Sequence, residues 1–182
     1  ARAWGTYGVR GSMYLSRVYP EAKSTLFDID GMRHVIKPDI TAWAAHSNRD
    51  SDELFPFDET VEGIDEVDGV SVGIRQRWQT RRGRDAGRRN VDVFTVDTEL
   101  GVFNDAPGED ITNGYTSFSR PENSLSHNYL NNAVIWRMND RTAVLSELNY
   151  DLNDNEVDIL NVSLAVERTP RFSYLLGYRF ID

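Results

Sequence analysis

Apolar and polar residues alternate along most of this chain with a period of two. The alternation is most regular near the end of the chain, and it recurs at about 142–152 and 156–167. In the last segment the apolar positions are Phe172, Tyr174, Leu176, Tyr178 and Phe180. Because successive side chains of a β-strand point to opposite faces, each segment predicts a strand with one apolar and one polar face.

The middle of the chain repeats this pattern at about 70–81, 94–102 and 131–138, whereas 3–18 and 33–46 are less regular. Pro38 in the last of these requires a sheet edge, a bulge or a kink, since proline cannot donate to a β-ladder. Short polar turns join several of the strands, and no long stretch keeps a helical spacing. The sequence therefore predicts an all-β fold, an antiparallel up-and-down meander of about eight strands.

The lengths of the strands and loops favour a membrane barrel over a soluble sandwich. The longest apolar runs have four residues, at 42–45 and 133–136, whereas a membrane-spanning helix needs about 20. A transmembrane β-strand needs only about 9–11 residues, half of them apolar. The long connections, Ser47–Asp68 and Asn104–Ser126, fall on one side of the meander and short turns on the other. This arrangement is typical of outer-membrane barrels.

Alternation within a barrel wall assigns each side chain to the lumen or to the lipid. The residues expected to line a polar lumen are Arg75, Arg77, Arg81, Asp97, Glu99, Glu147, Asn149, Asp151 and Ser163. Those expected to face lipid are Val72, Ile74, Trp78, Phe94, Val96, Leu148, Leu160, Val162, Leu164, Tyr174 and Leu176. Aromatic residues near strand ends, such as Trp78 and Trp136, are expected at the membrane interfaces.

Composition excludes several classes of function. The formal net charge of −9 disfavours nucleic-acid binding, and the absence of cysteine excludes disulfides and thiol catalysis. The three histidines, His34, His46 and His127, lie in separate segments without a local catalytic partner. The carboxylates and arginines of the lumen are interpreted as a charge-balanced lining. We therefore expect no enzyme activity, no metal site and no cofactor.

Two charged segments allow more than one interpretation. Residues 49–68 contain nine carboxylates, which could capture divalent cations but are more simply a solvated external loop. The arginines between 81 and 89 could contact anionic phosphates or a periplasmic partner, although a basic turn is often only a soluble turn. The segment 151–155 resembles the start of a calcium loop, but Glu156 stands where glycine is needed, so a hairpin turn is predicted.

The segment from Gly31 to Trp78 resembles the barrel of the LptD (OstA/Imp) family of lipopolysaccharide-assembly proteins. It contains Gly31–Ile40 around a basic–proline core, an acidic loop with Phe55–Asp58, and Gly63–Asp68 leading into a further strand. LptD proteins commonly carry cysteines, and this chain has none. The resemblance implies that residues 1–182 form one segment of the C-terminal barrel domain, without the N-terminal periplasmic domain and without the strands of the lateral gate.

The resemblance also implies a function and partners. It predicts an integral outer-membrane component of lipopolysaccharide transport to the cell surface of a Gram-negative bacterium, in contact with membrane lipid. An LptE-like plug lipoprotein and the periplasmic Lpt bridge would be its partners. Two alternatives remain open on the residues alone: a passive porin or small closed barrel, and a soluble carbohydrate-binding β-sandwich.

Overall fold

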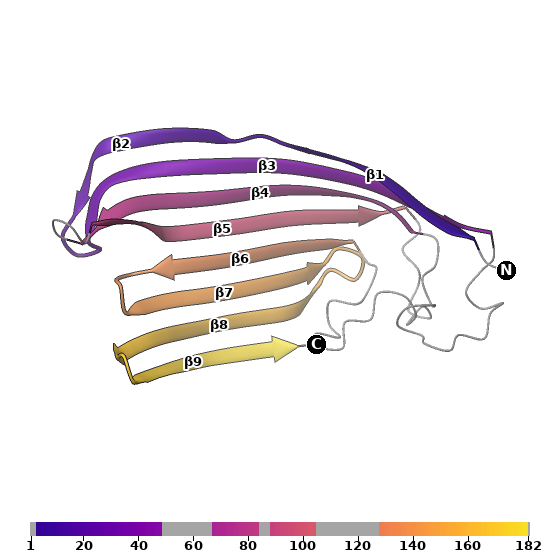
Figure 1. Cartoon of the computed structure of the whole chain (residues 1–182). Coiled ribbons are helices and arrows are strands. Elements are labelled where there is room, and N and C mark those ends of the chain that lie inside the picture. Colours follow the sequence, from indigo (N-terminus) through magenta and orange to yellow (C-terminus); the bar gives the residue numbers. More distant parts are fainter. Residues whose placement is uncertain (1–2, 49–66, 84–87, 105–127, 182) are drawn as a thin grey trace.

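The computed structural model describes residues 3–48, 67–83, 88–104 and 128–181, which form one antiparallel β-sheet (Figure 1). Its strands are β1 (Trp4–Ser12), β2 (Leu15–Ser24), β3 (Ile29–Ser47), β4 (Val67–Arg82), β5 (Arg89–Phe103), β6 (Tyr129–Arg137), β7 (Thr142–Asp151), β8 (Glu156–Thr169) and β9 (Phe172–Ile181). Within these ranges, no helix is long and apolar enough to cross a membrane. The predicted all-β antiparallel meander is confirmed.

The strands follow one another across the sheet in chain order. The spatial order runs β1–β3–β4–β5–β6–β7–β8–β9, with β2 also paired to β3. Strands β1 and β9 occupy opposite edges and do not pair with each other, so the described part of the sheet is open. No second layer of secondary structure covers either face among the described residues (Figure 1).

The sheet has nine strands where about eight were predicted, and Pro38 explains the difference. The predicted strand at 3–18 is divided into β1 and β2, which continue in line along β3 with the same register, Ser12 opposite Asp39 and Leu15 opposite Ile36. Met13 donates its N–H to the Pro38 carbonyl at 3.3 Å, but proline has no N–H to return the bond. The missing hydrogen bond interrupts the edge strand, while the β3–β4 ladder continues past it.

The connections separate into two ends of the sheet. The β2–β3, β4–β5, β6–β7 and β8–β9 connections lie at one end, here called the turn end, on the left in Figure 1. The connections at 48–66, 104–128 and 152–155 lie at the other, the loop end. The predicted loops at 47–68 and 104–126 fall mostly outside the described residues. The predicted turn after Asp151 is confirmed, since its Oδ1 accepts the N–H groups of Asn153 (2.5 Å) and Asp154 (3.1 Å).

Arg82, the last residue of β4, binds two connections together at the turn end. Its side chain is only 1% exposed, and Nη2 donates to the carbonyl oxygens of Phe27 and Arg137, both at 2.9 Å. Nη1 lies 3.6 Å from a carboxylate oxygen of Asp140. Since Phe27 belongs to the β2–β3 turn and Asp140 to the β6–β7 turn, one guanidinium joins turns that are far apart in sequence. The predicted basic cluster thus contains a structural residue that was not foreseen.

We expect Arg82→Ala to destabilise the fold strongly, by about 2–4 kcal/mol, because several buried carbonyl oxygens would lose a charged donor. Urea unfolding of the folded chain in lipid vesicles measures this change. The neighbouring Arg81 is exposed and serves as a matched control, so Arg81→Ala should stay within about 0.5 kcal/mol. Equal losses for the two variants would show that Arg82 does not hold the turns together.

Candidate functional site

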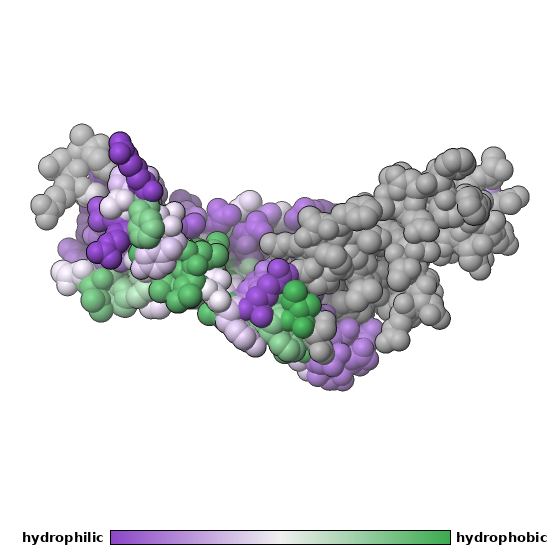
Figure 2. All heavy atoms as spheres, turned by 90° about the horizontal axis from the view of Figure 1, so that it is seen from below, coloured by the Kyte–Doolittle hydropathy of each residue, from purple (hydrophilic) through white to green (hydrophobic). Residues whose placement is uncertain are grey.

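The strand register sorts the side chains into two faces. Cross-strand partners share a face, and the pairs Arg75–Asp97, Glu99–Asn131 and Glu147–Asn161 define a polar face that crosses β4 to β8. All nine residues predicted for a lumen lie on this polar face. All eleven residues predicted to face lipid lie on the opposite, apolar face. Figure 2 shows apolar residues gathered mainly along one side of the sheet.

The polar face contains a hollow of about 440 Å³ in the middle of the sheet. Small residues open this space, since Gly73 and Ala133 lie among longer side chains on neighbouring strands. At Gly73 an added Cβ would meet Asp39 Oδ1 at 3.0 Å, so glycine permits that close approach. Of the residues predicted for a lumen, the hollow is lined by Arg75, Asp97, Glu99, Glu147 and Asn149. Arg77, Arg81, Asp151 and Ser163 share the face but lie outside the hollow.

Hydrogen bonds across the strands fix the carboxylates around the hollow. Arg75 Nε donates to Asp97 Oδ1 at 2.6 Å, and the Tyr129 hydroxyl donates to Glu99 Oε1 at 2.6 Å. Asn161 Nδ2 donates to Glu147 Oε2 at 2.9 Å. Because each carboxylate has a donor from a neighbouring strand, their positions are set by the sheet and not by flexible loops.

Two amide side chains line the hollow. Asn131 and Asn149 are opposite each other in the β6–β7 ladder, and both line the hollow. Asn149 is only 6% exposed, yet its Oδ1 has no hydrogen-bond partner among the described residues. A buried acceptor of this kind costs free energy unless water or a ligand donates to it. Asn131 is only half-buried and lines the hollow, so its amide can exchange hydrogen bonds with a molecule placed there.

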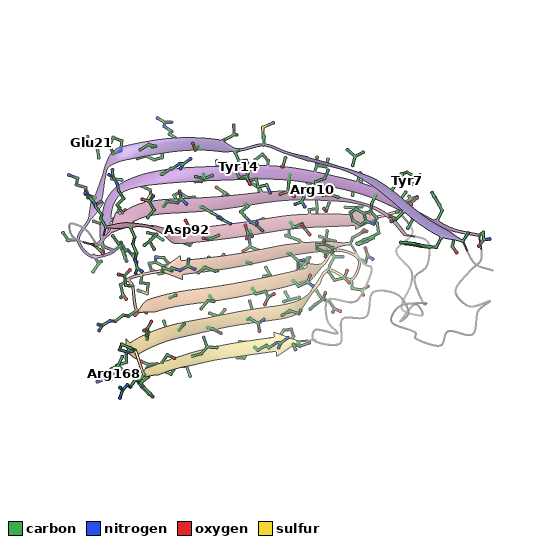
Figure 3. The ribbon with its side chains drawn as sticks, viewed as in Figure 1. Tyr7, Arg10, Tyr14, Glu21, Asp92 and Arg168 are labelled. Atoms are coloured by element: carbon green, nitrogen blue, oxygen red, sulfur yellow. The ribbon has the colours of Figure 1, made fainter. Side chains whose placement is uncertain are left out.

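The charges around the hollow are separated across the sheet. Cations come from its β1, β3 and β4 side, where Arg10 Nη2 lies 3.4 Å from Asp39 and Lys37 lies 5.6 Å from the Tyr14 ring centroid. Figure 3 shows Arg10 and Tyr14 on this side. Carboxylates Glu99 and Glu147 come from the β5 and β7 side. Arg10, Lys37, Asp39, Tyr129 and Asn131 were not predicted. Lys37 and Asp39 could have been predicted, because the polar residues at odd positions continue from Arg33 to Asp39.

The apolar face is exposed and interrupted by paired polar groups. Val72, Ile74 and Val162 are 48%, 39% and 42% exposed, as expected for a face without a covering layer. Some of its polar side chains bond to one another, since Asn132 Nδ2 donates to Thr98 Oγ1 at 2.7 Å. His34 and Gln76 form a similar pair, at 3.2 Å between Nε2 and Oε1.

Other candidate chemistry finds no support in the described part of the chain. Within it, no group of three or more histidine, aspartate or glutamate residues could hold a metal ion. His34 stacks on Trp78, with ring centroids 4.2 Å apart, and His46 lies beside Tyr7 near the loop end. His127, Arg84 and the acidic residues 49–66 lie outside the described residues.

Comparisons with known proteins add no identification. A scan against models of protein families finds no match, and a search of curated proteins finds none either.

We expect Tyr129→Phe to lower the free energy of unfolding by about 1–3 kcal/mol, since Glu99 would lose a short hydrogen bond to its carboxylate. Urea unfolding in lipid vesicles measures the effect. Tyr174→Phe is the control, because the Tyr174 side chain is 45% exposed on the apolar face. If the two variants are equally stable, the Tyr129–Glu99 contact does not hold the wall of the hollow.

Proposed function

We propose that this chain forms part of the wall of a transmembrane β-barrel, with its polar face toward an aqueous lumen and its apolar face toward lipid. The observation that carries the proposal is the division of side chains between the faces of a single-layer sheet. A soluble sheet with one apolar face must cover that face with another layer. A membrane barrel leaves the same face to the lipid and lines its interior with polar side chains.

The extent of the apolar face is compatible with a bilayer. On β4 the apolar positions run from Val70 to Trp78, about 27 Å along the strand at roughly 3.4 Å per residue. With a tilt of about 40°, this segment covers about 20 Å of the bilayer normal, close to the apolar band of about 25 Å in known barrels. On β3 the apolar face is longer, from Met32 to Ala44.

Two alternatives are weaker. A soluble carbohydrate-binding β-sandwich would need a second sheet, and the described residues form only one. A passive porin or small closed barrel would need β9 to pair with β1 and β2. Because β1 and β2 lie end to end along β3, the nine strands occupy eight places across the sheet. With an even number of places the two edge strands run in opposite directions, so antiparallel closure is geometrically possible.

The cargo that we propose is lipopolysaccharide, in an outer-membrane assembly of the LptD type. The support is the resemblance of residues 31–78, whose described parts, 31–48 and 67–78, belong to the adjacent strands β3 and β4. The hollow with its amide groups suits the hydroxyl-rich sugar part of such a lipid. In this proposal the chain acts with a plug lipoprotein and a periplasmic bridge, and it is not an enzyme.

We expect Val162→Arg to destabilise the chain in bilayers by about 2–4 kcal/mol, because it places a cation in lipid near the middle of a strand. Ser163→Arg is the matched control, since residue 163 is its neighbour but points to the polar face outside the hollow, and it should stay within about 0.5 kcal/mol. Urea unfolding in lipid vesicles compares the two variants. Equal costs, or a monodisperse β-rich chain in buffer without lipid, would contradict the membrane proposal.

The cargo has a separate test. In Gram-negative cells carrying the full protein, a photocrosslinking amino acid at Asn131 should capture lipopolysaccharide, because this residue lines the hollow. The same group at Val162 should capture phospholipid or lipid A acyl chains without the sugar region. If Asn131 captures no lipopolysaccharide while Val162 captures lipid, the barrel proposal stands and this cargo is wrong.

A further inference from the structure

Positive charge gathers at the turn end of the sheet. Six exposed cations there have no carboxylate partner among the described residues: Lys23, Arg33, Arg81, Arg141, Arg168 and Arg171. They come from both edges and from the middle of the sheet, so they form a rim along its whole width. We call these six residues the basic rim. Figure 3 shows Arg168 and Glu21 at this end, close to opposite edges.

The carboxylates of the turn end do not neutralise the basic rim, since most are paired with other arginines. Asp28 and Asp140 lie 3.9 and 3.6 Å from Arg82, and Asp92 lies 3.9 Å from Arg77. Asp30 is paired with Arg88. Glu21 and Glu167 are the remaining carboxylates of the described turn end, against six rim cations. The local charge is therefore positive, although the whole chain carries −9.

The loop end has the opposite charge. Its described residues include Asp68, Asp151, Asp154 and Glu156, and no lysine or arginine lies beyond the level of Arg10 at this end of the described sheet. The described sheet thus carries positive charge at the turn end and negative charge at the loop end. This separation of charge runs along the strands, whereas polar and apolar side chains are separated between the two faces. An acidic surface would be attracted to the turn end alone.

An aromatic row lies beside the basic rim on the apolar face. Trp78, Phe94 and Trp136 are consecutive cross-strand partners, and the Trp78 and Phe94 ring centroids are 5.2 Å apart. The row continues through Val144 to Leu164 on β8, and Arg168 follows Leu164 by four residues, about 14 Å along the strand. Aromatic side chains with cations just beyond them are typical of a membrane interface, where the rings lie at headgroup level and the charges reach phosphate.

We propose that the basic rim binds the headgroups of anionic phospholipids in the leaflet at the turn end. This inference rests on the proposed membrane function, and it adds a lipid class and a leaflet to it. Arg141 and Arg168 border a hollow of about 520 Å³ between the β6–β7 and β8–β9 turns, whose other charged residues are Asp28, Asp140 and Glu167. Arg82 pairs with both aspartates, so the two rim arginines are available for a phosphate.

An acidic protein could also bind a basic rim. The aromatic row favours lipid, because a protein-docking surface would not require a row of tryptophan and phenylalanine on the lipid-facing side at the same level. An acidic protein can bind the basic rim whether or not the sheet is inserted in a membrane. Lipid headgroups contact the rim only when the sheet is inserted. The two partners therefore differ in whether binding depends on insertion.

The test measures lipid preference in bilayers. The full chain is inserted into phosphatidylcholine vesicles that contain phosphatidylglycerol with brominated acyl chains, and tryptophan quenching gives the binding of phosphatidylglycerol relative to phosphatidylcholine. Trp78 and Trp136 lie at the turn end and report on this leaflet. We expect Arg141→Gln/Arg168→Gln to lower the preference by about fivefold for each arginine removed. Arg77→Gln/Arg179→Gln removes the same charge from the polar face outside the hollow and should change the preference less than about twofold.

The outcomes are distinct. If the chain inserts but shows no preference for phosphatidylglycerol, or if both double variants lose it equally, the basic rim is not a headgroup site while the barrel proposal stands. If the chain does not insert into any vesicle, both proposals are overturned. If the rim variant instead loses binding to soluble polyglutamate and keeps its lipid preference, the partner is an acidic protein.

Discussion

The backbone ladder of a single-layer sheet is the constraint on which the other features depend. With no covering layer among the described residues, the strands are held by their cross-strand hydrogen bonds and by the side-chain rows on the two faces. The register of the strands therefore determines both the stability of the sheet and which side chains lie on each face. A slip of one residue on β8 would exchange Val162 with Asn161 and put polar groups among the apolar rows. The same pairing that joins the strands keeps the two faces distinct.

The two ends of the sheet are stabilised differently. At the turn end, buried Arg82 joins the β2–β3 and β6–β7 turns, and Phe27 packs on Trp136 with ring centroids 5.7 Å apart. At the β7–β8 turn of the loop end, Asp151 accepts two backbone N–H groups within its own turn. A buried cation thus joins distant turns at one end, whereas the described turn at the other is held by Asp151 and by Asn128, whose Nδ2 donates to Asn153 Oδ1 at 2.9 Å.

The sequence predicted the faces better than it predicted the strand ends and the hollow. Period-two alternation assigns residues such as Glu147 and Leu148 to opposite faces without knowledge of their neighbours. It does not show that Ala133 faces Glu147, or that Tyr129 reaches Glu99, because these contacts depend on which strands pair and in which register. The division into β1 and β2 required Pro38 to be matched with Met13 across the ladder. The burial of Arg82 depends on a distant turn, so a basic cluster in the sequence could not reveal it.

The polar groups on the apolar face are the feature that a membrane-facing wall must accommodate. Thr98 and Asn132 satisfy part of each other's hydrogen-bonding capacity, and His34 pairs with Gln76 while its ring stacks on Trp78. Pairing lowers the cost of leaving water, which is high for an unsatisfied polar group. These pairs occupy neighbouring strands, so they also favour the observed register. The same side chains that weaken the hydrophobicity of the face thus help to align the strands that form it.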